Sequence, residues 1–374
     1  MHAFVIPQCL ILFVVNRYLN YGPDALFIWF EIRPEIDWKV KRIYSMNRRE
    51  KLFHHIDQNG YGLEIGPSFN PLAPKKDGYK VHILDHMDRE QLIAKYTGHH
   101  VPLENIEEVD FVWNGEDYSE LTGKSKYYDW IIASHLIEHT PDLIGFLNNC
   151  DSILKDDGVI SLVIPDKRYC FDHYRPITGI SQVIDGHFQK NKIHTPGTVA
   201  EYYLDRTTKN GEIAWHLNAP GTYEFAYSLD EAVQALDLAL KENTYVDLHS
   251  WCFVPHSFRL IIHDLVQLGL IHLREVDFFP TEGCEFFVTL SRSGKGINKT
   301  RLEMLDMIET EIKDEPPISV NQDAAALLAE KDNQLSAIYN STAWRLIQPL
   351  RRLLEISRGT WLERLWSFLR RKFN

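Results

Sequence analysis

Short apolar segments bounded by turn residues recur through the first half of the chain and predict five β-strands. They span residues 61–66, 79–85, 107–113, 127–134 and 158–166. Between the last two strands the apolar residues keep helical spacing, with Thr140 as the predicted N-cap and Pro141 at the first helical position. Repeated alternation of strand and helix predicts a parallel sheet covered by helices on both faces.

After the fifth strand the alternation stops, and residues 167–250 form a predicted insertion rich in His, Tyr and Pro. Helical spacing returns over residues 255–269, where Gly269 marks the predicted end of the helix. Two further strands, joined by the PTEG segment at 280–283, predict a hairpin that closes one edge of the sheet. The pattern therefore predicts an α/β domain over residues 46–292, with a mostly parallel sheet of seven strands.

The segments outside this domain have different patterns. Residues 1–45 are predicted to be an N-terminal extension, residues 293–321 a polar linker, and residues 322–374 a helical tail. The apolar run near the start of the chain is about thirteen residues long, which is too short to span a bilayer, and no clear signal-peptide cleavage site follows it. A cytoplasmic location is therefore expected.

The net charge of the chain argues against nucleic acid as a partner. The 374 residues carry a formal charge of −12, whereas binding to a phosphate backbone needs a basic surface. The charge is uneven: from Arg345 on, eight Lys or Arg and two Glu give +6, so the rest carries −18, which is −12 minus +6. The five cysteines form no CxxC pair, so neither a disulfide framework nor a cysteine zinc site is expected.

The segment LEIGPSFNP at 63–71 predicts a strand that runs into a ligand-binding turn at the carboxyl end of the sheet. A dinucleotide needs two or three glycines at such a turn, so that the backbone and the next helix can approach the pyrophosphate. Only Gly66 is present here. The turn therefore favours a cofactor without phosphates, such as an adenosine that carries an amino-acid sulfonium.

Four residues near the ends of the first three strands have the chemistry that such a cofactor needs. Glu64 is predicted to lie near its ammonium group, directly or through water. Asp85 ends the second strand, where dinucleotide folds place the acid that binds the ribose hydroxyls. Trp113 and Asn114 end the third strand and are predicted to flank the adenine with a ring face and an amide.

The chain resembles the class I S-adenosylmethionine-dependent methyltransferases in four segments that follow in order: LEIGPSFNP, ILDH, YYDWIIASHLIEHTPD and LKDDGVISLVIPD. The resemblance covers residues 47–292 and is strongest to the group with an SxHxxEHxxD segment after strand four. It implies a Rossmann-like fold with a terminal antiparallel hairpin. It also implies S-adenosyl-L-methionine as cofactor, with Gly66 and Ser134 among its contacts. The chain departs from the family's Gly-x-Gly-x-Gly motif, which affects individual contacts more than the fold.

The segment HLIEH at 135–139 also matches the H-x-x-E-H zinc signature of some metalloproteases. That signature needs both histidines one turn apart on a helix, whereas Pro141 places the predicted helix after His139. No metal is therefore expected. In the methyltransferase interpretation His139 is the predicted base that takes the proton of an acceptor hydroxyl, and His135 and Glu138 support cofactor or acceptor. A structural role for these loop histidines is the alternative.

Polar and aromatic residues are dense after strand five and near the end of the insertion. The predicted acceptor-binding residues are Asp166, Arg168, Tyr169, His249 and Trp251. Rings that stack on sugar faces, among polar groups that orient hydroxyls, favour a carbohydrate acceptor. Ordinary core packing of the same rings is the alternative.

The tail adds a second resemblance. The segment EKDNQLSAIYNSTAWRLIQPLRRL is similar to a helical segment of glycosyltransferases and methyltransferases of bacterial surface-polysaccharide synthesis. Its basic, amphipathic pattern predicts contact with an anionic membrane surface or with an acidic glycan enzyme. The combined prediction is a methyltransferase that O-methylates a sugar of a surface polysaccharide or its precursor. The alternatives are a non-catalytic scaffold of the same fold, and a glycosyltransferase that uses DHMD at 85–88 although its spacing differs from a metal-binding DxD motif.

Overall fold

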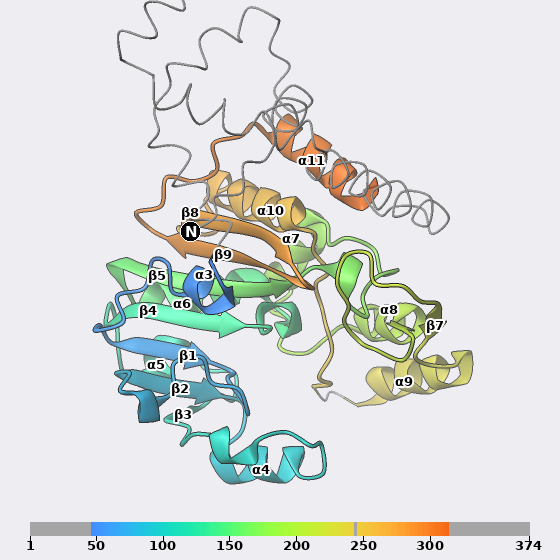
Figure 1. The fold of residues 1–374 in the computed structure, drawn as a ribbon, viewed down its shortest axis with the longest axis horizontal. Helices are drawn as coiled ribbons and strands as arrows, with labels where there is room; N and C mark the ends of the chain where they lie inside the picture. Colours follow the sequence, from blue (N-terminus) through green and yellow to red (C-terminus); the bar gives the residue numbers. More distant parts are fainter. Residues whose placement is uncertain (1–45, 243–244, 314–374) are drawn as a thin grey trace, which may run out of the picture. The chain divides into compact units, whose positions relative to one another are not determined.

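The computed structural model describes residues 46–242 and 245–313, and Figure 1 shows how their elements are arranged. The described residues up to Ile308 belong to one compact unit, and those from Glu309 belong to a second. The predicted extension at 1–45 and the predicted helical tail at 322–374 lie outside the described residues.

The central sheet has seven strands in the order β3-β2-β1-β4-β5-β9-β8. Their bounds are β1 Gly62–Ile65, β2 Val81–Asp85, β3 Phe111–Val112, β4 Tyr128–Ser134, β5 Leu154–Pro165, β8 Arg274–Glu282 and β9 Glu285–Ser291. The first five strands pair with one another in parallel, whereas β9 is antiparallel to β5 and β8 is antiparallel to β9. The predicted Rossmann-like class I methyltransferase fold, with its terminal hairpin, is therefore confirmed by the strand order.

Nine helices accompany the sheet in the described residues. They are α3 Arg48–Leu52, α4 Arg89–Tyr96, α5 Tyr118–Thr122, α6 Leu143–Ile153, α7 Ile180–Phe188, α8 Pro196–Asp205, α9 Leu229–Lys241, α10 Pro255–Gln267 and α11 Arg301–Lys313. The predicted insertion contributes α7, α8, α9 and the small hairpin of β6 (Thr207–Lys209) and β7 (Tyr223–Phe225). Across the described ranges, no helix has both the length and the apolar character that crossing a bilayer requires.

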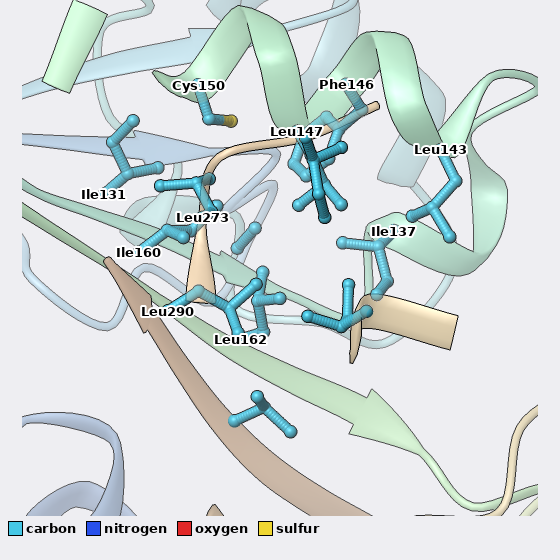
Figure 2. Close-up of a cluster of buried hydrophobic side chains, with 14 of the residues drawn as sticks. Ile131, Ile137, Leu143, Phe146, Leu147, Cys150, Ile160, Leu162, Leu273 and Leu290 are labelled. Carbon is cyan, nitrogen blue, oxygen red and sulfur yellow. The ribbon is translucent and has the colours of Figure 1, made fainter. Parts of the chain in front are cut away.

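The main hydrophobic core lies between α6 and the sheet. Apolar residues three and four positions apart share one face of a helix, and α6 buries such a face. Figure 2 shows this face over side chains of β4 and β5. The residues are Leu143, Phe146, Leu147 and Cys150 on the helix and Ile131, Ile160 and Leu162 on the strands. This packing fixes the loop between β4 and α6 at the carboxyl edge of the sheet.

Several boundaries differ from the sequence-based prediction. The strand predicted at 107–113 is limited to Phe111–Val112, and the strand predicted at 158–166 begins earlier, at Leu154. The N-cap of α6 is Asp142, whose side chain accepts a hydrogen bond of 2.8 Å from the backbone N–H of Gly145, and it is not Thr140. Thr140 instead follows a 3-10 turn and donates its hydroxyl to the carbonyl of Ile137. Within the predicted linker at 293–321, residues 301–313 form α11.

Candidate active site

The turn after β1 requires glycine at position 66. Gly66 has a φ of +64°, a conformation that L-residues rarely adopt. A Cβ there would lie 2.7 Å from Cδ1 of Leu136, which belongs to the loop after β4. The turn after β1 and the loop after β4 therefore approach each other closely at the carboxyl edge of the sheet.

Glu64 supports the chain that follows this turn. Its buried carboxylate accepts hydrogen bonds from the backbone N–H groups of Leu72 at 2.7 Å and Ala73 at 3.0 Å. Burial raises the pKa of Glu64 to about 7, although these two hydrogen bonds act in the opposite direction. The structure thus places Glu64 beneath the loop that it holds, and a contact with a cofactor ammonium stays a prediction.

Asp85 lies at the end of β2 and is also buried. One of its oxygens, Oδ1, accepts the backbone N–H of His86 at 2.7 Å and lies 2.6 Å from the imidazole of the same residue. Within residues 46–242 and 245–313, the other oxygen, Oδ2, accepts only a long hydrogen bond of 3.3 Å, from the backbone N–H of Ser68. The carboxylate therefore joins β2 to the turn after β1 and keeps acceptor capacity on Oδ2.

The predicted adenine-flanking residues follow β3, beside Asp85. The backbone N–H of Trp113 donates to the carbonyl of Asp85 at 2.8 Å. The indole N–H of Trp113 donates to the carbonyl of Glu116 at 2.7 Å, and its ring packs against the core. Asn114 is exposed, and its amide donates to the carbonyl of Val112 at 3.3 Å. The structure thus brings the turn, Asp85 and Trp113 to one edge of the sheet.

The loop after β4 begins with residues tied to the hairpin. His135 has a φ of +50°, and its Nε2 lies 2.8 Å from Oε2 of Glu285, the first residue of β9. Arg48 bonds the same Glu285 at 2.6 Å and donates to the hydroxyl of Ser134 at 3.2 Å. Burial lowers the pKa of His135, but the hydrogen bond to Glu285 and the charge of Glu138 outweigh it, so the pKa is raised overall.

Glu138 follows in a 3-10 turn and its side chain is fully buried. Neither carboxylate oxygen has a hydrogen-bond partner among the described residues. Three imidazole nitrogens surround Oε1 beyond hydrogen-bond distance: Nδ1 of His135 at 3.8 Å, Nε2 of His249 at 3.9 Å and Nε2 of His139 at 4.0 Å. We call Glu138, His139 and His249 the histidine cluster.

Each histidine of the cluster has its own carboxylate. Nδ1 of His139 lies 3.0 Å from Asp247, and Nδ1 of His249 lies 2.5 Å from Asp172. The two rings are perpendicular, with centroids 4.6 Å apart. Burial lowers the pKa of His139, but the adjacent carboxylate of Asp247 and the charge of Glu138 outweigh it and raise the pKa overall.

A buried arginine holds the carboxylate behind His249. Arg175 donates to Asp172 and to the carbonyl of His249, both at 2.9 Å, and it pairs with Glu201 of α8 at 3.0 Å. Asp172 and Arg175 are each 1% exposed. Burial raises the pKa of Asp172, but the charges of His249 and Arg175 outweigh it, so this pKa lies well below its ordinary value.

The other predicted acceptor residues lie elsewhere. Asp166 is fully buried and is bonded by Arg168 at 2.6 Å and by the hydroxyl of Thr281 at 2.6 Å, which ties the end of β5 to the hairpin. Tyr169 is buried beside this pair. Trp251 is 7% exposed and packs in the main core, which favours a packing role over stacking on a sugar.

Of the five predicted acceptor residues, only His249 joins the histidine cluster. Sequence reasoning missed Asp247, Glu285 and Arg48 as members of the site. Asp247 stands two positions before His249, so this spacing was the signal available for it. For Glu285 and Arg48, which meet across 237 positions, the sequence carries no local signal.

Comparison with known proteins gives one match to a family model, described as a methyltransferase domain, over residues 41–255. A search of curated proteins finds no match. Among solved structures, a Pyrococcus horikoshii OT3 protein is 12% identical, with a TM-score of 0.31, and the match covers 70% of this chain and 92% of that one.

Two further structures are similar to the same degree. Burkholderia thailandensis 1,6-didemethyltoxoflavin-N1-methyltransferase is 11% identical, with a TM-score of 0.28 and coverage of 78% of this chain and 92% of that chain. A SAM-dependent methyltransferase from Aquifex aeolicus is 12% identical, with a TM-score of 0.32 and coverage of 65% and 88%. The fold assignment is carried by the strand order and not by these values.

Proposed function

The chain belongs to the methyltransferase domain family, and from this premise we propose that it transfers a methyl group from S-adenosyl-L-methionine to a hydroxyl oxygen of a sugar. The predicted class of enzyme and its methyl donor agree with the family. The sugar acceptor is our own inference. The observation that carries it is the histidine cluster, which the insertion completes at the carboxyl edge of the sheet.

The residues around the turn after β1 fit the methyl donor. Gly66 lets the backbone approach a ligand closely, since it has no Cβ. Asp85 keeps acceptor capacity on Oδ2, which suits the ribose hydroxyls of an adenosine. When bound, S-adenosyl-L-methionine supplies an electrophilic methyl group. The chain's own task is to hold the acceptor hydroxyl in line with it and to exclude water.

His139 is suited to take the proton of the acceptor hydroxyl. Its Nδ1 lies 3.0 Å from Asp247 without forming a hydrogen bond, and the nearby carboxylate charge favours a proton on Nδ1. That tautomer leaves the lone pair of Nε2 for the acceptor. The acceptor oxygen bonds to the methyl carbon while the carbon–sulfur bond breaks and its electron pair stays on sulfur. The hydroxyl proton then resides on Nε2, where the nearby charge of Glu138 favours it.

Tyr245 supports a carbohydrate more directly than Trp251 does. Its hydroxyl donates to the carbonyl of His139 at 3.4 Å, and 42% of its surface is exposed. An exposed ring beside imidazole and carboxylate groups can stack on a sugar face while these groups bind hydroxyls. The tail segment that favours a surface polysaccharide lies outside the described residues, so that part of the proposal is supported by the sequence resemblance alone.

Calorimetry with S-adenosylhomocysteine tests the donor side. We expect micromolar binding that weakens by roughly 10- to 150-fold in Asp85→Ala, since a hydrogen bond to a charged group contributes about 1.5–3 kcal/mol. Asp77→Ala, which changes an exposed carboxylate before β2, is the matched control and should bind normally. A flat trace with the unchanged protein favours the scaffold alternative, and binding of a nucleotide sugar alone favours the glycosyltransferase.

Transfer of label tests the acceptor side. The protein is incubated with S-adenosyl-L-methionine labelled in its methyl group and with glycan extracts. We expect label on the oxygen of a sugar, identified by mass spectrometry after hydrolysis. Label on nitrogen or carbon of a non-carbohydrate acceptor would reject the sugar and keep the methyltransferase.

A further inference from the structure

The histidine cluster contains a buried charge without a partner. Glu138 is fully buried, and its two carboxylate oxygens lack hydrogen-bond donors among the described residues. A buried carboxylate in this condition costs several kcal/mol unless a cation or donors compensate it. The nearest imidazole nitrogens stop at 3.8–4.0 Å, which is too far for hydrogen bonds. The carboxylate therefore faces its histidines across a gap.

Two of these histidines present the nitrogen that a metal would use. Nδ1 of His249 is hydrogen-bonded to Asp172, whereas Nδ1 of His139 lies 3.0 Å from Asp247 without the geometry of a hydrogen bond. Both histidines have Nε2 on the side of Glu138. A carboxylate behind the imidazole fixes the tautomer and orientation of metal-binding histidines in proteins. The three residues form one group of possible ligands, because one ligand atom from each of them lies within 4.8 Å of the other two.

The spacing of the ligand atoms matches a small cation. With bonds of about 2.0–2.2 Å in tetrahedral geometry, two ligand atoms lie about 3.4 Å apart. Oε1 of Glu138 lies 3.9 Å from Nε2 of His249 and 4.0 Å from Nε2 of His139. A contraction of roughly half an ångström, within the reach of small side-chain rotations, brings these atoms to bonding distance.

The donor set indicates which metal. Two imidazoles and one carboxylate, with a fourth position open, form the ligand set of catalytic zinc sites. Calcium and magnesium prefer sites made of oxygen ligands only. Arg175 holds Asp172, so the orientation of His249 is fixed by a second layer of contacts. The cluster thus has three ligands and a carboxylate beside each histidine, and Arg175 holds one of these carboxylates, Asp172, in place.

A second group of potential ligands lacks these features. His54, His55 and Asp277 also lie within ligand distance, but they are partly exposed, and one oxygen of Asp277 lies 2.7 Å and 3.0 Å from the two imidazoles. These distances are those of direct hydrogen bonds, so the carboxylate is already satisfied. The surface group serves as a control for non-specific binding.

We propose that Glu138, His139 and His249 bind one zinc ion. A catalytic role for this ion rests on the proposed function. The acceptor hydroxyl would take the open fourth position, and the ion would favour transfer of the hydroxyl proton to water. The ion would then replace His139 as the group that activates the hydroxyl. The oxygen then bonds to the methyl carbon, and the electron pair of the broken carbon–sulfur bond stays on sulfur. His139 is in this case a ligand and not a base.

Metal binding is measured first, without reference to activity. Full-length protein with His54→Ala and His55→Ala is stripped with chelator, dialysed and titrated with zinc chloride by calorimetry, and native mass spectrometry counts the bound ions. We expect one zinc per chain and an increase in Tm on binding. The visible spectrum of the cobalt-substituted protein should show tetrahedral coordination.

Variants assign the ligands. Glu138→Gln and His249→Ala should each weaken zinc binding by roughly 100-fold or more, and Asp247→Asn, behind a ligand, by about 10- to 100-fold. His263→Ala, which removes an imidazole paired with Asp264 at 3.1 Å on α10, should leave binding unchanged. Because Glu138→Gln removes an unpaired buried charge and keeps the shape, it should fold at least as stably as the stripped parent protein.

The outcomes separate this site from the proposed function. No zinc bound to the chain that lacks His54 and His55, or equal binding after His249→Ala, overturns the metal site. Full methyl transfer by stripped protein also overturns it as a catalytic site while the proposed function stands. Zinc bound through Glu138 and His249 without transfer to any sugar supports the site and rejects the proposed acceptor.

Discussion

The two sides of the candidate active site satisfy their buried carboxylates in different ways. On the donor side, the backbone N–H groups of neighbouring loops bond Glu64 and Asp85. On the acceptor side, Asp172 is held by the side chains of Arg175, three positions away, and His249, 77 positions away. The carboxylate oxygens of Glu138 have no hydrogen-bond partner among the described residues. Backbone donors thus already compensate the buried carboxylates of the donor side, whereas the carboxylate of Glu138 still requires a cation or a hydrogen-bond donor.

This contrast separates binding from chemistry. A turn built from its own backbone can position a methyl donor with little reorganisation, which is how electrostatic preorganisation works. The acceptor side needs the insertion, since His249, Asp247, Asp172 and Arg175 all come from it. The specificity of the enzyme is therefore expected to vary with the insertion, and its cofactor with the sheet.

The largest expected effect is a loss of methyl transfer caused by a change on the acceptor side alone. His139→Ala should lower methyl transfer by about 10²- to 10⁴-fold, because it removes the group that activates the acceptor hydroxyl. Binding of S-adenosylhomocysteine, followed by calorimetry, should stay within a factor of a few. His187→Ala, which removes an imidazole paired with Asp142 at 3.0 Å, is the control. Unchanged turnover in His139→Ala would exclude His139 from the chemistry.

A second change tests how the insertion is held. Arg175→Met should lower the free energy of unfolding by about 3–5 kcal/mol, because it leaves Asp172 buried with one fewer compensating charge. Urea denaturation followed by circular dichroism measures it. The control is Arg301→Met, whose 61% exposed side chain pairs with Asp264 and should contribute about 0–1 kcal/mol. Equal losses in the two variants would show that burial of Arg175 does not matter for stability.

The smallest effect concerns the donor side and pH. Burial raises the pKa of Glu64 to about 7 from the ordinary 4.5, so the folded chain holds this proton where the unfolded chain has lost it. The free energy of unfolding should therefore fall as pH rises from about 4.5 to about 7, by about 3 kcal/mol at most, and then level off. Below pH 4.5 this contribution is fully present.

The comparison with Glu64→Gln isolates this contribution, because other groups also titrate in the same range. Denaturation curves between pH 4.5 and pH 8 should show a flatter profile for Glu64→Gln than for the unchanged chain. Glu90→Gln, on the exposed face of α4, should keep the original profile. Parallel profiles in all three proteins would show that Glu64 keeps an ordinary pKa in the fold.

The fold was accessible from the sequence because its signals are local. Each strand is a short apolar run, and the helix of residues 255–267 ends two residues before Gly269, which has a φ of +72°. The N-cap of α6 was misplaced at Thr140 because Pro141 favours a helix start, whereas the 3-10 turn before it moves the start to Asp142. Boundaries of this kind depend on tertiary packing.

The site was accessible only in part. Asp85 ends β2 and His139 lies in the loop after β4, both at the edge where α/β folds bind ligands, and the sequence predicts this position for both. The partnership of His139 with His249 spans 110 positions and depends on how the insertion folds back, which no spacing in the sequence encodes. Trp251 packs in the main core, and its predicted contact with a sugar stays a prediction, because sequence alone does not separate an aromatic residue of a site from one of the core.

The close approach of Leu136 to Gly66 limits how the two sides can be exchanged between related enzymes. A hybrid that takes the loop after β4 from another methyltransferase must have, in place of Leu136, a side chain that fits against Gly66. The insertion at 167–250 contains neither residue of this contact, so it can be exchanged between related enzymes more easily than the loop after β4. Chimaeras that join at the ends of the insertion, and leave residues 134–142 in place, should keep their methyl donor while changing their acceptor.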